Sequence, residues 1–241
     1  MQAIVLAGGR GSRLDPYTRI LPKPLFPIGD KPIAAILMQQ LQSAGVDEII
    51  MCLGYLENLI KLYFQDGRQF GLKIRYSVET DPLGTAGPLR MVKDLKDDFI
   101  VVNGDELTTL DFQALYEHHL AMQADMTVAV QKKAVSSSFG VLEIKDGQVT
   151  AYAEKPTLNY WASMGIYVIN KRIISLIPEN KRFDMPDLVQ RLLSEHAQVV
   201  SFESQDLWFD IGTMADLEKA KEEFEQLDLP WKGLSKFGAF S

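Results

Sequence analysis

The sequence predicts an α/β protein with a mixed, mostly parallel sheet flanked by helices, and three observations support that fold class. The chain has 241 residues, of which 46% are apolar and 24% charged, which suffices for one large domain with a buried core. Runs of apolar, β-branched residues alternate with amphipathic stretches, a pattern typical of βαβ units. Because no repeat or low-complexity linker divides the chain, we expect one domain over residues 1–228 and a C-terminal tail over 229–241.

In the first half of the chain, this alternation predicts a Rossmann-like series of strands and crossover helices. Asp30 stands at the place of a helix N-cap, Pro32 in the first turn and Gly45 at the end, which together frame one helix. The predicted strands cover residues 3–6, 48–53, 73–77 and 99–102, and the predicted helices cover 32–44, 57–64, 85–93 and 112–122.

The second half predicts an antiparallel portion added to this sheet. Asp146 and Gly147 form a hairpin turn signal between strand candidates at 140–144 and 148–154. Another strand is expected over 162–169, and helices over 171–177, 185–194 and 213–225. The tail shows no clear period, and we expect it to pack on the domain or on another subunit.

The stretch IVLAGGRGSRLDPYTRILPKP, residues 4–24, has the chemistry of a triphosphate-binding turn. An apolar run ends in a loop with Gly8, Gly9 and Gly11, and glycines let backbone N–H groups come close to an anion. Arg13 and Lys23 add cations that neutralise phosphate charge. Residues 1–31 hold five Lys or Arg against two Asp, in a chain whose net charge is −7. The alternative is an ordinary glycine-rich turn between a strand and a helix.

Two common phosphate loops do not fit this stretch. It contains no Gly-Lys-Ser/Thr, so it is not the loop of a P-loop nucleotidase. Leu14 also stands where the third glycine of the dinucleotide fingerprint G-x-G-x-x-G would fall. These two loop classes are therefore excluded, and a different phosphate-binding loop or an ordinary turn stays open.

Further motifs follow the loop and carry a family resemblance. They are ETDPLGTAG (79–87), NGDEL (103–107), FG (139–140), EKP (154–156), MGIY (164–167) and WFDIGT (208–213). With GGRGSRL and PKPL before them, they resemble the signature of the sugar-1-phosphate nucleotidylyltransferases, which make nucleotide sugars, and particularly the mannose-1-phosphate guanylyltransferases. The resemblance spans nearly the whole chain and implies a nucleotidyltransferase domain over 1–228.

The resemblance implies a transfer reaction that depends on cations. A sugar-1-phosphate oxygen attacks the α-phosphorus of a nucleoside triphosphate, and pyrophosphate leaves. It implies that Arg13 holds the triphosphate, that Lys23 contacts phosphate, and that Asp105 and Asp210 bind catalytic Mg²⁺. Taken alone, each aspartate could instead cap a helix or sit in a turn. The nucleotide-binding residues implied are Leu6, Ala7, Gly8, Gly9, Gly11, Ser12, Arg13, Glu79, Gly84 and Thr85.

The sugar phosphate is expected to contact the second half of the chain. The resemblance implies that Glu154 and Lys155 hold it, that Gly140 allows its close approach, and that Asn103 and Ser163 complete this set. From the residues alone, Glu154 and Lys155 could be an exposed charge pair before a proline turn. Ser163 is a departure, because relatives acting on mannose-1-phosphate often carry asparagine at this position. Pro88 is a second departure, replacing the usual alanine after TAG.

Glu79 is the residue from which we predict the base. Relatives that use uridine or thymidine triphosphates often have glutamine at this position, and glutamine can both donate and accept hydrogen bonds. An ionised glutamate only accepts, and guanine presents the adjacent donors N1–H and N2–H₂. We therefore expect GTP, with mannose-1-phosphate or a related manno-configured sugar phosphate. The alternative is that Glu79 points to solvent and backbone groups near Gly84 read the base.

Composition narrows the remaining classes of function. The acidic balance argues against nucleic-acid and membrane-surface partners, and no apolar segment is long enough to span a bilayer. A single cysteine, Cys52, fits a reducing compartment, so we expect a cytoplasmic protein. The sequence leaves open whether the chain forms a homo-oligomer. The alternative functions are a uridylyl- or thymidylyltransferase for glucose-1-phosphate, a non-catalytic regulatory subunit that binds sugar nucleotides, and a glycosyltransferase of related fold.

Overall fold

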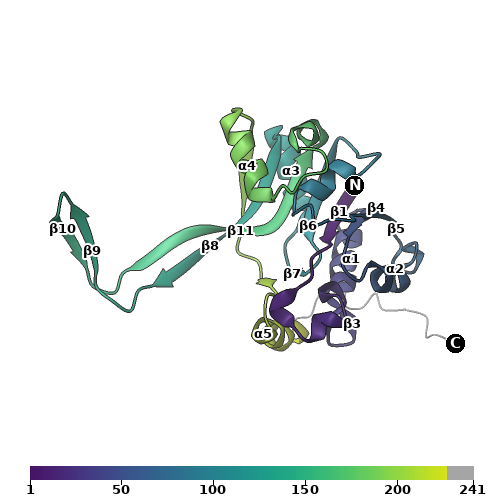
Figure 1. Cartoon of the computed structure of the whole chain (residues 1–241), viewed down its shortest axis with the longest axis horizontal. Coiled ribbons are helices and arrows are strands. Elements are labelled where there is room, and N and C mark those ends of the chain that lie inside the picture. The colour runs from purple at the N-terminus through teal and green to yellow at the C-terminus, as the bar shows by residue number, and fades with distance from the viewer. Residues whose placement is uncertain (227–241) are drawn as a thin grey trace.

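A mixed seven-stranded sheet organises the chain, and helices cover both of its faces (Figure 1). The computed structural model describes residues 1–226, so the predicted tail at 229–241 lies outside the described residues. The strand order is β12-β8-β11-β6-β1-β4-β5, and β11 is the described strand that runs against its two neighbours. The strands are β1 (Gln2–Ala7), β4 (Glu48–Leu53), β5 (Lys73–Val78), β6 (Asp98–Asn103), β8 (Met126–Ser136), β11 (Thr157–Asn170) and β12 (Val199–Ser204).

Alternation along the buried strands separates two core layers. In β1, Ala3 and Val5 face the layer formed with α1 (Ile33–Ser43), α2 (Glu57–Phe64) and α3 (Phe112–Met122). Ile4 faces the opposite layer, which contains α4 (Met185–Ser194). A third cluster joins α5 (Met214–Glu225) to Leu14 and Ile28 beside the end of β1. These layers confirm the predicted α/β fold class with a mostly parallel sheet.

Three local predictions are wrong. Residues 85–93 form only a 3₁₀ turn, Gly87–Met91, because the backbone becomes extended at Val92, where φ is −72° and ψ is 128°. The N–H groups of Ala86 and Gly87 donate to the Phe183 carbonyl at 2.9 Å. The helix predicted at 171–177 is likewise a 3₁₀ turn, Lys171–Leu176. Asp30 lies in the turn between β2 (Pro27–Ile28) and β3 (Lys31–Pro32), and the N-cap of α1 is Pro32.

The predicted antiparallel portion is a long arm that projects from the sheet (Figure 1). Strands β8 and β11 pair outward as far as Ser136 and Thr157, beyond β12 and β6. At its end lies the hairpin of β9 (Val141–Lys145) and β10 (Gln148–Ala153), whose turn residues Asp146 and Gly147 both have positive φ, 51° and 80°. The hairpin signal in the sequence is thereby confirmed. Among the described residues, no helix has the length and apolar character needed to cross a membrane.

Candidate active site

The glycine loop lies at the carboxyl end of β1, where parallel sheets place their ligand sites. It leads from Ala7 into a short 3₁₀ turn at Ser12–Leu14, with Gly11 at φ 61°, a conformation that favours glycine. Gly8 is tightly placed, because a Cβ built on it would lie 2.8 Å from the Glu79 carboxylate. Gly9 has no atom within 4 Å of the position that its Cβ would take, so it borders open space. The backbone of the loop therefore forms one wall of a cleft.

Two adjoining pockets form this cleft. They share Leu6, Gly9, Ser12, Arg13 and Asp105, and the larger encloses about 670 Å³. Each of the ten nucleotide-binding residues implied by the resemblance lines one or both of them, as do Lys23, Asn103, Asp105 and Asp210. The structure therefore brings together residues that lie more than 200 positions apart in the sequence.

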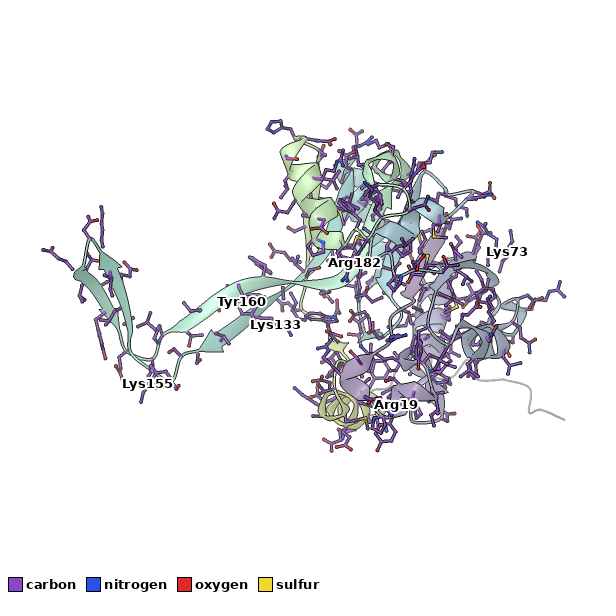
Figure 2. All side chains as sticks on the ribbon, viewed as in Figure 1. Arg19, Lys73, Lys133, Lys155, Tyr160 and Arg182 are labelled. Atoms are coloured by element: carbon purple, nitrogen blue, oxygen red, sulfur yellow. The ribbon has the colours of Figure 1, made fainter. Side chains whose placement is uncertain are left out.

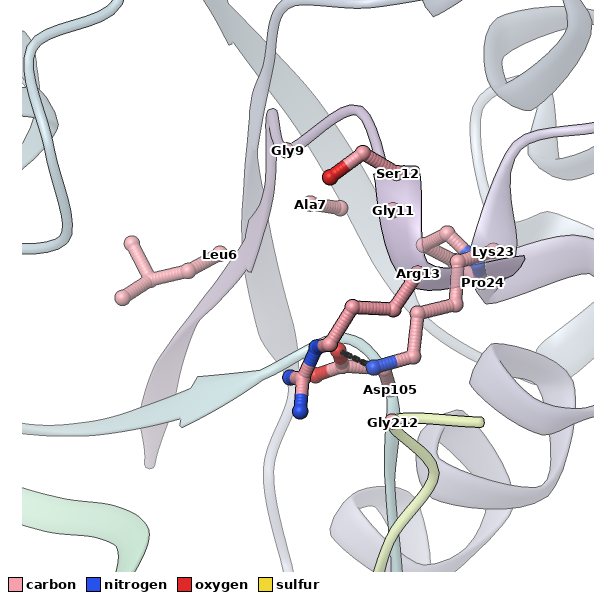
Figure 3. A pocket seen from close by; sticks show the side chains of 10 residues that line it. All are labelled: Leu6, Ala7, Gly9, Gly11, Ser12, Arg13, Lys23, Pro24, Asp105 and Gly212. Atoms are coloured by element: carbon pink, nitrogen blue, oxygen red, sulfur yellow. Dashed lines mark hydrogen bonds and ion pairs between the residues drawn. The ribbon is translucent and has the colours of Figure 1, made fainter. Parts of the chain in front are cut away.

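Lys23 lies beside Asp105 in the smaller pocket (Figure 3) and is also close to Asp210. Its ammonium group pairs with the Asp105 carboxylate and lies 3.7 Å from Asp210 Oδ1. The lysine side chain is 8% exposed and that of Asp210 51%, so the cation is held within the wall while Asp210 reaches solvent. Both carboxylates therefore lie close to one cation, the Lys23 ammonium group.

A short strand pair brings Asp210 to this position. Strand β13 (Trp208–Asp210) pairs antiparallel with β7 (Glu106–Thr108). Asp210 lies opposite Glu106, which is the residue next to Asp105 in the sequence. The hydroxyl of Thr108 donates to the Leu207 carbonyl at 2.7 Å, which adds a further tie between the two segments. The distant motifs NGDEL and WFDIGT therefore meet through strand pairing.

Glu106 is a site residue that the sequence analysis missed. It is buried beneath the cleft, where its carboxylate accepts hydrogen bonds from Trp208 Nε1 at 2.7 Å and from Asn103 Nδ2 at 3.1 Å. Burial, followed by the charge of Asp105, raises the pKa of Glu106 well above its usual range. Its place within NGDEL was visible, but only the pairing of β7 with β13 shows that its side chain supports Asn103 and the acidic pair.

Gly212 was also missed, although it belongs to the WFDIGT motif. It lines the cleft beside Arg13, and a Cβ built on it would lie 2.8 Å from the Arg13 guanidinium (Figure 3). The absence of a side chain here leaves space for the Arg13 guanidinium. Within the cleft, Arg13 and Lys23 present two cations to any bound polyanion.

The opposite end of the cleft contains Glu79. Its Oε2 accepts a hydrogen bond from the Leu83 backbone N–H at 3.0 Å, and its carboxylate packs against Gly8 and Gly54. Burial raises the pKa of this carboxyl group. Since Glu79 lines the larger pocket, the structure does not support the alternative in which it points to solvent.

Gly84 and Thr85 lie against a segment that the sequence analysis did not include in the site. The backbone N–H of Thr85 donates to Asp184 Oδ1 at 3.0 Å, and the Thr85 hydroxyl accepts from the Met185 N–H at 2.7 Å. Gly84 has φ 83°, and a Cβ on it would lie 2.5 Å from the Asp184 carboxylate. Asp184 and Arg182 also line the larger pocket. These contacts hold the 84–85 turn in the wall of the cleft.

The predicted sugar-phosphate residues do not lie together. Asn103 lines the cleft, and Ser163 lies at the root of the arm, where its hydroxyl is 3.2 Å from that of Tyr167. Gly140, Glu154 and Lys155 are exposed on the arm where the β9–β10 hairpin joins β8 and β11, as Figure 2 shows for Lys155, and Tyr152 donates a hydrogen bond to the Glu154 carboxylate. Their role in holding the sugar phosphate stays a prediction.

Comparisons with known proteins identify the family of the chain. The sequence model of the family described as nucleotidyl transferase matches residues 2–226. The chain is 32% identical over 233 residues to a D-glycero-α-D-manno-heptose 1-phosphate guanylyltransferase of Aneurinibacillus thermoaerophilus, covering 93% of this chain and 99% of that protein. It is 33% identical to a mannose-1-phosphate guanyltransferase of Yarrowia lipolytica, covering 90% of this chain but 62% of the longer fungal protein.

Solved structures show the same similarity. A putative glucose-1-phosphate thymidylyltransferase from Bacillus anthracis superposes with a TM-score of 0.78 at 26% identity, covering 95% of this chain and 97% of that chain. HddC from Yersinia pseudotuberculosis superposes with a TM-score of 0.73 at 29% identity, covering 92% and 99%. Together with the glycine loop and the acidic pair, these matches show that the chain belongs to the nucleotidyl transferase family, among its sugar-1-phosphate nucleotidylyltransferases.

Proposed function

We propose that this chain transfers the guanylyl group of GTP to a manno-configured sugar 1-phosphate, with Mg²⁺ as its metal, and releases pyrophosphate. The observation that carries this proposal is the Glu79 carboxylate in the wall of the cleft, beside the glycine loop. The relatives named as heptose and mannose guanylyltransferases support the same choice of base and of sugar configuration.

The hydrogen bonds of Glu79 favour guanine. Oε2 already accepts from Leu83, and among the described residues no donor is found for Oε1. A carboxylate can accept from both N1–H and N2–H₂ of guanine, because each oxygen has two lone pairs. The edge of a uracil-type base would instead place carbonyl oxygens against it. The carboxylate therefore attracts guanine and repels uracil and thymine.

The residues present fit a Mg²⁺ ion that is shared with the substrate. Magnesium ions in phosphoryl-transfer sites commonly use one or two carboxylates, with substrate phosphates and water completing the shell. Asp105 and Asp210 converge on the Lys23 ammonium, so they can share a small cation. No group of three or more His, Cys, Asp or Glu side chains placed to hold a metal occurs within residues 1–226. Asp105 and Asp210 would therefore hold the ion, which when bound neutralises phosphate charge.

The remaining chemistry requires positioning and cations. A phosphate monoester has a second pKa of about 6, so the attacking sugar-phosphate oxygen is already ionised at neutral pH. The bond from this oxygen to the α-phosphorus forms while the bond to the β-phosphate oxygen breaks, and pyrophosphate carries away the electron pair. We assign the binding of the leaving charge to Arg13, which lies beside Gly212, and Lys23 would add a second cation.

A substrate panel tests this proposal. Pure protein is incubated with Mg²⁺ and each of GTP, UTP, ATP, CTP and dTTP, together with mannose, glucose and manno-heptose 1-phosphates, and pyrophosphate release is measured. We expect the highest kcat/KM with GTP and a manno-configured partner. Preference for UTP or dTTP would contradict the choice of base, and pyrophosphate release with none of the pairs would contradict the proposed transfer.

A further inference from the structure

The arm exposes an unusual amount of apolar surface for its length. We define the arm as residues 132–162, the part of β8, β9, β10 and β11 beyond the central sheet. Every one of its residues is exposed or half-buried. Ten of the nineteen exposed large hydrophobic side chains found among the described residues lie on it, including Phe139, Ile144 and Tyr152 at 77%, 66% and 64% exposure. Exposed apolar surface of this extent marks an interaction site.

The hairpin at the end of the arm is apolar on one face and mixed on the other. Val149 pairs with Ile144, and Tyr152 with Leu142, so these four side chains lie on one face. The other face carries the polar residues Glu143, Lys145 and Gln148 together with Val141, Ala151 and Ala153. Since an isolated two-stranded hairpin is at best marginally stable in water, the apolar face needs a partner surface.

The arm begins at the floor of the cleft. The pairing of β11 with β8 shifts register between Ser163 and Tyr167, and Gly165 in this segment has φ 70°. A Cβ on Gly165 would lie 2.4 Å from Asn103 Nδ2 and 2.6 Å from Glu106 Oε1. From this root the arm extends away from the central sheet, and Lys155 lies at the bend where the hairpin begins (Figure 2).

We propose that two copies of this chain exchange arms, so that the hairpin of each covers the cleft of the other and supplies Gly140, Glu154 and Lys155 to it. This inference rests on the proposed function, because it takes these residues as the sugar-phosphate contacts. Each copy has one cleft that these residues do not reach and one arm that carries them outward. A two-fold exchange completes both clefts at once, since it makes a closed, isologous contact.

A second copy fits better than an unrelated partner. An unrelated partner would cover the apolar hairpin but would leave the predicted sugar-phosphate residues away from a nucleotide cleft. In the exchanged dimer, the apolar face of the hairpin instead packs on the second copy, and Lys155 contacts the sugar phosphate in the cleft of that copy. A fold-back of the arm onto its own cleft would use the same residues, so the experiment must separate exchange between copies from fold-back within one copy.

Complementation between two inactive variants makes this separation. Asp210→Asn removes the proposed metal ligand from the cleft, and Lys155→Met removes the cation from the arm. The two variants are co-expressed with different tags, and purified mixed dimers are compared with each variant alone. If arms are exchanged, the Lys155→Met cleft receives an intact arm from its partner. The purified mixed dimers then recover roughly half of wild-type activity, because one of their two sites is intact.

A photo-crosslink gives a readout independent of activity. Phe139 is replaced by p-benzoylphenylalanine, and ¹⁴N- and ¹⁵N-labelled chains are mixed before irradiation. We expect cross-linked peptide pairs that join light to heavy chains, while the same replacement at Leu62, which is 72% exposed on α2, should form few of them. These cross-links would support the exchange even if no transferase activity is found. The experiment therefore distinguishes a failure of the proposed function from a failure of the proposed exchange.

The oligomeric state of two matched variants tests whether the apolar face of the hairpin holds the dimer together. Ile144→Asp should convert the wild-type dimer to monomers in sedimentation experiments, whereas Leu62→Asp, at a similarly exposed leucine, should leave the dimer intact. A monomeric wild type, cross-links confined to chains of one label, or mixed dimers without recovered activity would each overturn the proposal.

Discussion

At the residue scale, the cleft is organised around charges that lie close together but are solvated differently. Lys23 is enclosed by the wall, Asp210 reaches solvent, and Glu106 is buried beneath both aspartates. Sequence motifs identified Lys23, Asp105 and Asp210 as site residues. They did not identify Glu106, because nothing in NGDEL indicates which of its two carboxylates turns inward.

Removing the carboxylate charge of Asp210 should block turnover without unfolding the protein. Asp210→Asn keeps the shape of an exposed side chain, and Lys23 keeps its pairing with Asp105. We expect kcat to fall by several orders of magnitude, with an unchanged melting temperature. Glu218→Gln, on an exposed position of α5, is the charge-matched control and should keep normal kcat. Near-normal turnover in Asp210→Asn would show that this residue is not a metal ligand.

Glu79→Gln should weaken the preference for GTP. The amide oxygen can still accept from the Leu83 N–H, so the local backbone should be maintained. The amide nitrogen, however, would face the donors of guanine and could donate to a carbonyl oxygen of uracil. We expect kcat/KM to fall for GTP and to rise relative to it for UTP and dTTP. An unchanged ratio among the three nucleotides would disprove the assignment of Glu79 to base reading.

At the element scale, short tertiary connections position the site as much as the main sheet does. The β13–β7 pair holds Asp210, and the turn into α5 places Gly212 beside Arg13. On the other side of the molecule, β1, β4 and β5 are joined by a polar cluster around Glu48, whose side chain is 13% exposed.

Gly212→Ala should disturb Arg13 specifically. The added methyl group would lie 2.8 Å from the end of the Arg13 side chain, which is flexible and can move aside. We therefore expect a folded protein with lower kcat and a higher KM for the nucleoside triphosphate. Stopped-flow or steady-state kinetics would measure both values, and wild-type kinetics would mean that the position of Arg13 does not matter for the reaction.

Glu48 should stabilise the edge of the sheet in a pH-dependent manner. Burial opposes its ionisation, but contacts with Lys73, Gln2 and Arg75 outweigh burial and lower its pKa from 4.5 to about 2. Because the folded pKa is depressed, this contribution is fully present above pH 4.5 and is lost as the pH falls toward 2. Glu48→Gln should therefore reduce the free energy of unfolding by at most about 3 kcal/mol at pH 7.

Denaturant titrations of both proteins at several pH values test the prediction for Glu48. The difference between wild type and Glu48→Gln should shrink steadily below pH 4.5. A difference that stays constant down to pH 2 would show that lost packing, rather than lost charge, explains the effect.

At the scale of the whole molecule, the proposed metal site has two carboxylates, Asp105 and Asp210, and would need oxygen ligands from the substrate to complete its shell. We expect Mg²⁺ to bind weakly to the protein alone and much more tightly when GTP is present, because phosphate oxygens add ligands. Calorimetric titration with and without a non-hydrolysable GTP analogue measures this difference, and EDTA should abolish activity reversibly. Tight binding of Mg²⁺ to the protein alone would indicate a metal site made entirely of protein groups.

Local patterns were sufficient to predict the α/β architecture and much of the cleft. The alternating strands, the helices at 57–64, 112–122 and 185–194, and the Asp146-Gly147 hairpin depend on periodicity and turn residues within a few positions of one another. The glycine loop is equally local, since the end of a strand followed by Gly8, Gly9 and Gly11 carries its own geometry. Strands β8 and β12 were not predicted, and only their pairing with β11 and with each other defines them.

Tertiary structure decided the features that depend on contacts between distant residues. The segment 85–93 is held to the Phe183 carbonyl and becomes extended at Val92, so it forms a 3₁₀ turn in place of the predicted helix. The pairing of β13 with β7 places Asp210 over Glu106 and burial then raises the pKa of Glu106. The direction of the arm, which carries Lys155 away from its own cleft, follows from the pairing of β8 with β11 along their whole length. The sequence by itself determined which residues form the glycine loop and the hairpin, because those conformations are encoded within a few neighbouring residues. Only the packing of segments about a hundred residues apart determined which side chains meet.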